Sequence, residues 1–176
     1  MDDIRTDRLI LKPLKLEYAD SIFPIWNDEE VVQYTYIHSV NDLENCKNRI
    51  SRMIEGTKSR NDVGPYAIFV QDELIGIVSG HQQSLIEYAL WYHLGRKFWG
   101  YGYATEAAKA VMDMTFSNPA VMRISAEAVT TNPASSRVLE KLGMTKEGCL
   151  RMKFHRDGVF RDFYAYSILR NEYFAE

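Results

Sequence analysis

The sequence predicts a mixed α/β fold, in which a largely antiparallel sheet is flanked by helices. Short runs of branched and aromatic residues indicate strands, and apolar residues at helical spacing indicate helices. The two kinds of segment follow one another without the strict βαβ alternation that a parallel sheet requires. Because nothing in the 176 residues repeats and no Pro-, Gly- or Ser-rich linker interrupts them, we expect residues 1–176 to form one domain.

About seven strands and four helices are predicted in chain order. They are strands at 8–11, 66–70, 74–79, 86–94, 122–129, 148–155 and 159–169, and helices at 16–27, 41–55, 104–115 and 133–142. Pro24 should kink or shorten the first helix, because proline lacks the N–H that a helix interior needs. Ser39 and Asp42 suit a capping box for the second helix, and Gly56 should end it. Residues 28–39 between these helices are expected to be irregular.

Turn residues and periodicity define the C-terminal half. The short loop at 71–73 and the Arg-Asp-Gly turn at 156–158 each predict a hairpin. The segment 104–115 is the clearest helix, because its small and apolar residues form one stripe. Pro133 favours the first position of the short helix that follows, and Gly143 should end that helix.

Composition excludes several classes of protein. The chain carries 21 Lys and Arg against 24 Asp and Glu, a net charge of −3, so it lacks the basic surface that nucleic acids or an anionic membrane attract. It has no apolar run of about eighteen residues and begins with a polar segment, which predicts a cytoplasmic protein without a membrane span. The two cysteines are far apart and the four histidines lack ligand spacing, so we expect no metal.

The most informative segment is the glycine-containing turn between the strand at 86–94 and the helix at 104–115. Gly100 and Gly102 allow a close approach of backbone to a ligand, and N–H groups at a helix N-terminus favour an anion such as a pyrophosphate. A bare G-x-G is more often a tight turn without a ligand. The sequence lacks the third glycine of the dinucleotide fingerprint and the G-K-[ST] of a P-loop.

Three segments of the chain carry motifs that can be compared with known families. They are the run Lys97-Phe98-Trp99-Gly100-Tyr101-Gly102, residues 6–13 (TDRLILKP) and residues 132–144 (NPASSRVLEKLGM). Together they resemble the Gcn5-related N-acetyltransferase (GNAT) superfamily, in the branch of ribosomal-protein N-terminal acetyltransferases. The run at 97–102 is similar to the acetyl-CoA loop of that superfamily, and the other two segments resemble the opening segment and the C-terminal block of the branch. The motifs follow the expected order through nearly the whole chain.

The resemblance implies a GNAT-like fold and an acetyl-CoA site. The strand at 86–94 and its parallel neighbour at 122–129 are expected to splay apart, so that free backbone groups pair with the pantetheine arm. The cofactor-binding residues it implies are His93, Leu94, Lys97, Phe98, Trp99, Gly100, Tyr101, Gly102, Tyr103, Ala104, Asn132 and Ser135. An amide near Leu94 would stabilise the oxyanion, and Ser135 would protonate the departing thiolate. Helix capping alone also explains Asn132, and a small polar residue such as Ser135 is ordinary in a first helical turn.

The general base is left open by the sequence. Ala89 stands where many members of the superfamily carry a glutamate. Glu87 has the same strand parity and could act through water, as could His93 or His155. An exposed salt bridge explains Glu87 equally well, and simple packing explains the histidines.

The leading interpretation is an acetyl-CoA-dependent N-acetyltransferase that transfers acetyl directly to a primary amine, of a protein N-terminus such as a ribosomal protein or of a small molecule. The amine is expected to enter between the segment with Tyr34, Tyr36 and His38 and the final hairpin with His155. The main alternative is a non-catalytic acyl-CoA-binding or regulatory domain on the same fold, since the usual carboxylates are missing. The oligomeric state is open between monomer and homodimer.

Overall fold

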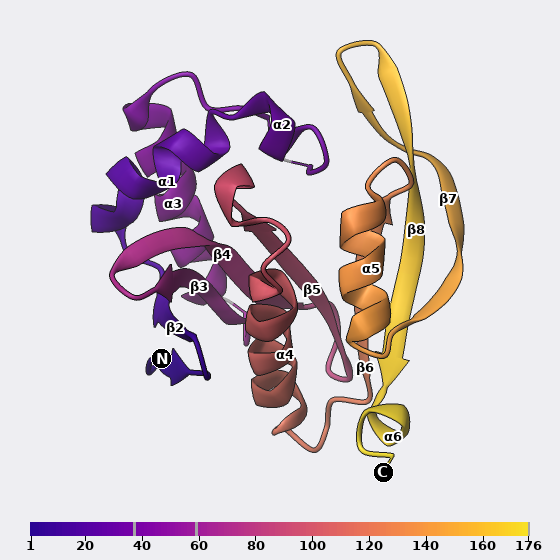
Figure 1. The fold of residues 1–176 in the computed structure, drawn as a ribbon. Coiled ribbons are helices and arrows are strands. Elements are labelled where there is room, and N and C mark those ends of the chain that lie inside the picture. Colours follow the sequence, from indigo (N-terminus) through magenta and orange to yellow (C-terminus); the bar gives the residue numbers. More distant parts are fainter. Residues whose placement is uncertain (37, 59, 176) are drawn as a thin grey trace.

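The computed structural model describes residues 1–36, 38–58 and 60–175, and the strands in these ranges form one eight-stranded sheet. Its order is β1-β2-β3-β4-β5-β6-β8-β7 (Figure 1). The strands are β1 (Ile4–Arg5), β2 (Leu9–Pro13), β3 (Val63–Val70), β4 (Glu73–Gln82), β5 (Glu87–Leu94), β6 (Arg123–Val129), β7 (Thr145–Arg156) and β8 (Val159–Leu169). The helices are α1 (Ala19–Trp26), α2 (Glu29–Val32), α3 (Leu43–Lys58), α4 (Tyr103–Phe116), α5 (Pro133–Lys141) and α6 (Arg170–Tyr173), with 3₁₀ turns η1 (Leu16–Tyr18) and η2 (Arg96–Phe98).

Helices cover both faces of the sheet (Figure 1). On one face, Leu90 of β5 belongs to the same apolar core as Val111 of α4 and Leu139 of α5. On the other face, Ile77 of β4 belongs to a second core with residues of α1 and α3 such as Ile50. Successive residues of a strand point to opposite faces, so one strand supplies both cores.

The centre of the sheet contains its one parallel pair among the described strands, and this pair separates. β5 and β6 pair only at Glu87 with Arg123, Tyr88 with Ile124 and Ala89 with Ser125. Beyond these positions β5 stays paired with β4 as far as Leu94, and β6 stays paired with β8 as far as Val129. The facing edges of β5 and β6 therefore lack a strand partner toward their carboxyl ends. The mixed, largely antiparallel fold and the splayed central pair that the sequence predicts are confirmed.

Helix α3 differs from its predicted bounds at both ends. It continues through Gly56 to Lys58, so the prediction that Gly56 ends it is wrong. A glycine inside a helix costs only about 1 kcal/mol relative to alanine, which buried side chains earlier in the helix, such as Ile50, readily offset. At the start, Asp42 Oδ1 accepts a hydrogen bond from the Asn45 N–H at 2.7 Å, so the helix cap is Asp42 itself and not Ser39.

The N-terminal helices also depart from the prediction. α1 is shorter than predicted, begins after the 3₁₀ turn η1, and contains Pro24 without ending there. The segment 28–39, predicted to be irregular, contains α2, whose N-cap Asp28 accepts from the Glu30 N–H at 2.9 Å. Ile37 of that segment lies outside the described residues. None of the described helices is long and apolar enough to cross a membrane.

Candidate active site

The separated ends of β5 and β6 line a cavity. Residues 90–94 form one wall and residues 126–128 the opposite wall. Of the predicted cofactor residues, those that line this cavity are His93, Leu94, Phe98, Trp99, Gly100, Gly102, Tyr103, Ala104, Asn132 and Ser135. Lys97 and Tyr101 belong to the same loop but are not among the lining residues. The structure thus brings together residues that are up to about forty positions apart in the chain.

The glycine loop exposes backbone at the start of α4. Gly100 and Gly102 have φ values of +84° and +82°, a left-handed conformation that glycine adopts without strain. A Cβ built at Gly100 meets no described atom within 4 Å, so the space beside the backbone is open. At Gly102, which precedes α4, no described side chain caps the helix. The first N–H groups of α4 are therefore available to an anion, which fits a pyrophosphate.

The N-terminal segment holds this loop in place. The Arg8 guanidinium donates from Nε to Glu106 Oε2 at 2.7 Å and from Nη1 to the Tyr101 carbonyl at 2.9 Å. The Thr6 hydroxyl donates to Glu106 Oε1 at 2.6 Å. Burial acts to raise the pKa of Glu106, but the hydrogen bonds from Thr6 and Arg8 outweigh it and hold that pKa below its usual value. The motif at residues 6–13 thus has a structural role at the loop.

Cationic side chains near the loop differ in what they contact. Lys97 forms a salt bridge with Glu73. Arg96 forms one with Glu30 of α2, with the nitrogen and oxygen 2.7 Å apart. Arg137 and Lys141, one turn apart on α5, both line the cavity. The positive charge that an anionic ligand would meet inside the cavity therefore comes from α5 and not from Lys97.

The first turn of α5 places two polar side chains at the cavity. Asn132 Oδ1 accepts from the Ser135 N–H at 3.2 Å, so Asn132 caps the helix while lining the cavity. The Ser135 hydroxyl lies 3.0 Å from the hydroxyl of Tyr92 on β5. Burial raises the pKa of Tyr92 to about 12, so its phenol keeps its proton at physiological pH.

His93 is held neutral inside the protein. The Trp26 indole Nε1 donates to His93 Nε2, which fixes the ring proton of the neutral form on Nδ1. Burial, with the charge of Arg49 nearby, lowers the pKa of His93 to about 3. Its Nδ1 is buried and has no hydrogen-bond partner among the described residues. With Nε2 already accepting a hydrogen bond, this ring has no free lone pair to take a proton from a substrate.

The opposite side of the cavity is aromatic and carries a carboxylate. Tyr34, Tyr36 and Phe163 line it, and the rings of Tyr36 and Phe163 stack with centroids 4.7 Å apart. The Tyr36 hydroxyl donates to the carboxylate of Glu127, which also pairs with Lys153 Nζ at 3.3 Å. Burial, followed by the contact with Glu127, raises the pKa of Tyr36 above its ordinary value.

Contacts between α2 and the final hairpin enclose this side. Arg156, near the end of the hairpin, is buried and donates from Nη1 to the Val32 carbonyl of α2 at 2.9 Å. The Tyr36 ring also meets Phe154 of β7 edge to face, with centroids 5.1 Å apart. The two segments between which the acceptor is expected to enter are thus in direct contact.

Three of the residues predicted for catalysis or for binding the acceptor lie outside the cavity lining. Glu87 accepts from Arg123 Nε at 3.2 Å, at the end of β5 that stays paired with β6. His38 lies close to Phe154, with ring centroids 6.4 Å apart. His155 packs on Phe160 at the hairpin turn, with centroids 4.5 Å apart. The structure does not bring these three side chains together with the glycine loop.

Several residues of the cavity escape the sequence analysis. Glu127 is the one carboxylate among the described lining residues, and Tyr92 and Lys141 also line the cavity. Glu127 carries a weak signal in the sequence, because it is a charged residue among the small and apolar residues 124–129. Among the described residues, no group of three or more His, Cys, Asp or Glu side chains could hold a metal ion.

Comparisons with known proteins identify the family. The family described as "Acetyltransferase (GNAT) domain" matches residues 8–145. A Bacillus licheniformis protein named "Uncharacterized N-acetyltransferase p20" is 32% identical over 98% of this chain and 99% of its own length. A GNAT-family acetyltransferase structure from Bacillus anthracis is 23% identical, with a TM-score of 0.83 over 96% of this chain and 99% of that chain.

A further solved structure contains a ligand. The structure of RimL, named as a ribosomal L7/L12 alpha-N-protein acetyltransferase in complex with coenzyme A, superimposes with a TM-score of 0.84. It is 19% identical and covers 95% of this chain and 97% of that one, so it shows that the fold is shared. The family match over most of the chain, together with the full-length relative, shows that this protein belongs to the GNAT acetyltransferase family.

Proposed function

We propose that this protein transfers the acetyl group of acetyl-CoA directly to a primary amine, either a protein N-terminus such as that of a ribosomal protein or a small molecule. The observation that supports this best is the pair of unpaired strand edges beyond Ala89 and Ser125, which end beside a helix N-terminus that no described side chain caps. An extended chain with a pyrophosphate at one end fits this combination, because it can add to the sheet edge and place its anion on the amides.

Each part of the cavity then has a task in binding the acetyl donor. The amides of the loop from Lys97 to Ala104 hold the pyrophosphate, and Arg137 and Lys141 supply positive charge beside it. The free edges of β5 and β6 hold the pantetheine arm. A backbone amide near Leu94 stabilises the oxyanion that forms when the amine attacks. Holding both reactants in one cavity supplies much of the rate enhancement.

The acceptor amine is recognised on the aromatic side. Glu127 attracts its ammonium form and takes the proton that must leave before or during attack, directly or through water. The Tyr36 hydroxyl and Lys153 both contact Glu127 and so orient its carboxylate. His93 is not assigned this role, because Trp26 occupies its Nε2.

Release of free coenzyme A from acetyl-CoA, measured with a panel of small amines and N-terminal peptides, tests the proposal. Turnover with peptides alone assigns a protein N-terminus as acceptor, and turnover with small amines alone assigns a small molecule. Tight coenzyme A binding without turnover on any acceptor would instead identify a binding or regulatory domain on the same fold.

A further inference from the structure

Two hydroxyl groups from different elements of the fold meet at the cavity, those of Tyr92 and Ser135. Tyr92 comes from β5 and Ser135 from the first turn of α5, 43 positions later. Their oxygens are 3.0 Å apart, and both residues line the cavity. Tyr92 reaches α5 because alternate residues of β5 face that side of the sheet, as Tyr88 and Leu90 also do.

The two hydroxyls can share their hydrogens in two ways. In one arrangement Tyr92 donates to Ser135 Oγ, which leaves the Ser135 hydrogen free to point into the cavity. In the other, Tyr92 donates to the Ser135 carbonyl and the Ser135 hydrogen is used up on Tyr92. The carbonyl lies 3.4 Å from the Tyr92 oxygen, against 3.0 Å for Oγ. The shorter contact favours the first arrangement.

We propose that Tyr92 is a positioning residue, whose hydroxyl fixes the Ser135 hydroxyl so that its hydrogen points toward the sulfur of the acetyl donor. This rests on the proposed function. Because a serine hydroxyl otherwise rotates freely, an acceptor bond on one side selects the direction of donation on the other. The phenol of Tyr92 stays protonated, so it remains a donor throughout.

The proton and electron balance of the transfer is simple. The amine nitrogen forms a bond to the acetyl carbon, and the bond from that carbon to sulfur breaks with its electron pair on sulfur. Ser135 gives its hydroxyl proton to that sulfur. The amine nitrogen loses a proton as the new bond forms, and this proton restores the Ser135 hydroxyl. Tyr92 keeps its own proton, and its hydrogen bond stabilises the Ser135 oxygen during the interval in which that oxygen has no proton.

Kinetics of Tyr92→Phe, Ser135→Ala and the double variant test the pairing. We expect Ser135→Ala to lower the single-turnover rate by about 10²-fold. Tyr92→Phe should lower it by roughly tenfold, the effect of one hydrogen bond, with the affinity for coenzyme A within about twofold of the wild type. The double variant should be no slower than Ser135→Ala, because Tyr92 acts through Ser135.

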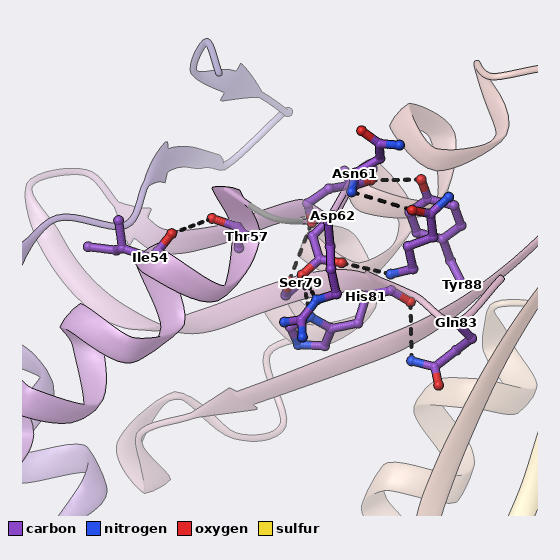
Figure 2. A network of polar contacts seen from close by, with 11 residues as sticks. Ile54, Thr57, Asn61, Asp62, Ser79, His81, Gln83 and Tyr88 are labelled. Carbon is purple, nitrogen blue, oxygen red and sulfur yellow. Dashed lines mark hydrogen bonds and ion pairs between the residues drawn. The ribbon is translucent and has the colours of Figure 1, made fainter. Parts of the chain in front are cut away.

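Tyr88→Phe is the matched control for the loss of a buried hydroxyl. Tyr88 lies on the same strand and face as Tyr92. Its hydroxyl donates to the Asn61 carbonyl at 2.7 Å (Figure 2). Neither Tyr88 nor Asn61 is among the residues that line the cavity. This variant should lose about as much stability as Tyr92→Phe and keep the wild-type rate. A rate equal to wild type in Tyr92→Phe, or losses that multiply in the double variant, would overturn the positioning role.

A second measurement does not depend on turnover. Ultraviolet absorption of the thiolate reports the pKa of the coenzyme A thiol in its complex with each variant. If Ser135 donates to sulfur, Ser135→Ala and Tyr92→Phe should both shift that pKa upward, by about one unit for a hydrogen bond of ordinary strength. No shift in either variant contradicts the proposal. If the thiol pKa shifts in both variants but the protein acetylates no amine, the positioning role of Tyr92 stands and the proposed function is wrong.

Discussion

Arg8 and Glu106 join the N-terminal segment to the first turn of α4, with Nε and Oε2 2.7 Å apart. The same guanidinium holds the Tyr101 carbonyl between the two glycines of the loop. Loop amides can bind an anion tightly only if they already point in the bound direction, so this clamp should matter for ligand affinity more than for the fold.

Arg8→Gln should therefore weaken coenzyme A binding several-fold, while lowering the free energy of unfolding by about 1 kcal/mol or less, as is typical of a partly exposed ion pair. Glu106→Gln should have a similar effect, and the double variant should be little worse than either one. Calorimetric titration and denaturant unfolding separate the two quantities. Equal coenzyme A affinity in wild type and both variants would show that the loop needs no clamp.

Gly102→Trp should weaken coenzyme A binding strongly, because the indole crowds the pyrophosphate position. Since Gly102 has a φ of +82°, the variant also carries backbone strain of about 1–2 kcal/mol. Gly158→Trp is the matched control, since Gly158 has a φ of +77° at the exposed hairpin turn. It should show a similar loss of stability with unchanged affinity. If both variants bind coenzyme A like the wild type, the loop is not the pyrophosphate site.

Arg137→Gln should reduce coenzyme A affinity, and the loss should shrink as salt concentration rises, because the guanidinium lines the cavity and acts by charge. Lys97→Gln serves as the comparison, since Lys97 is already paired with Glu73 and does not line the cavity. Its affinity should stay within about twofold of the wild type. A larger loss for Lys97→Gln than for Arg137→Gln would reverse the assignment of charge to α5.

Glu127→Gln should lower the turnover number by about 10²-fold or more, with coenzyme A affinity unchanged, because the amide cannot accept the amine's proton. Glu147→Gln is a suitable control, since Glu147 lies on the exposed strand β7, where it pairs with Nη2 of Arg123 from β6. Steady-state rates at saturating acceptor, measured across pH, check both variants. Full activity in Glu127→Gln would assign proton removal to water alone.

Burial of neutral His93 makes stability depend on pH. Its pKa is about 3 in the folded protein against 6.5 as the ordinary value, so only the unfolded chain binds this proton between these two pH values. The free energy of unfolding should fall as pH decreases below about 6.5, by at most about 1.4 kcal/mol per pH unit from this residue. His93→Asn should be less stable at neutral pH but show a shallower slope in urea unfolding across this range. Parallel pH profiles for the two proteins would count against the assignment.

Local patterns predict much of the fold because their causes are local. The hairpin at 71–73 and the helix at 104–115 follow from turn residues and apolar periodicity within a few positions. Helix ends are less predictable: Gly56 is a weak stop signal that packing earlier in α3 overrides. The four-residue helix α2 has too few residues to show a period.

The sequence predicts the glycine loop of the cavity but not the contacts between side chains that are distant in the chain. The glycine loop is contiguous, so its residues can be recognised together. The pairs Trp26 with His93 and Tyr92 with Ser135 are separated by 67 and 43 positions. The residues around each of these side chains do not indicate its partner, because strand register and helix docking decide which side chains meet. From the sequence alone His93 is a candidate base, and only the structure shows that its Nε2 already accepts a hydrogen bond from the Trp26 indole.

Under the proposed function, the gap between β5 and β6 also makes the stability of this protein depend on the concentration of its acetyl donor. A chain that fills the gap completes the hydrogen bonding of the sheet, and only the folded state offers that gap. At a free coenzyme concentration of one hundred times its dissociation constant, such binding adds about 2.7 kcal/mol to the free energy of unfolding. The melting temperature would then report how much acetyl donor surrounds the protein, and starvation for it would leave the central strands the least protected against proteolysis and exchange.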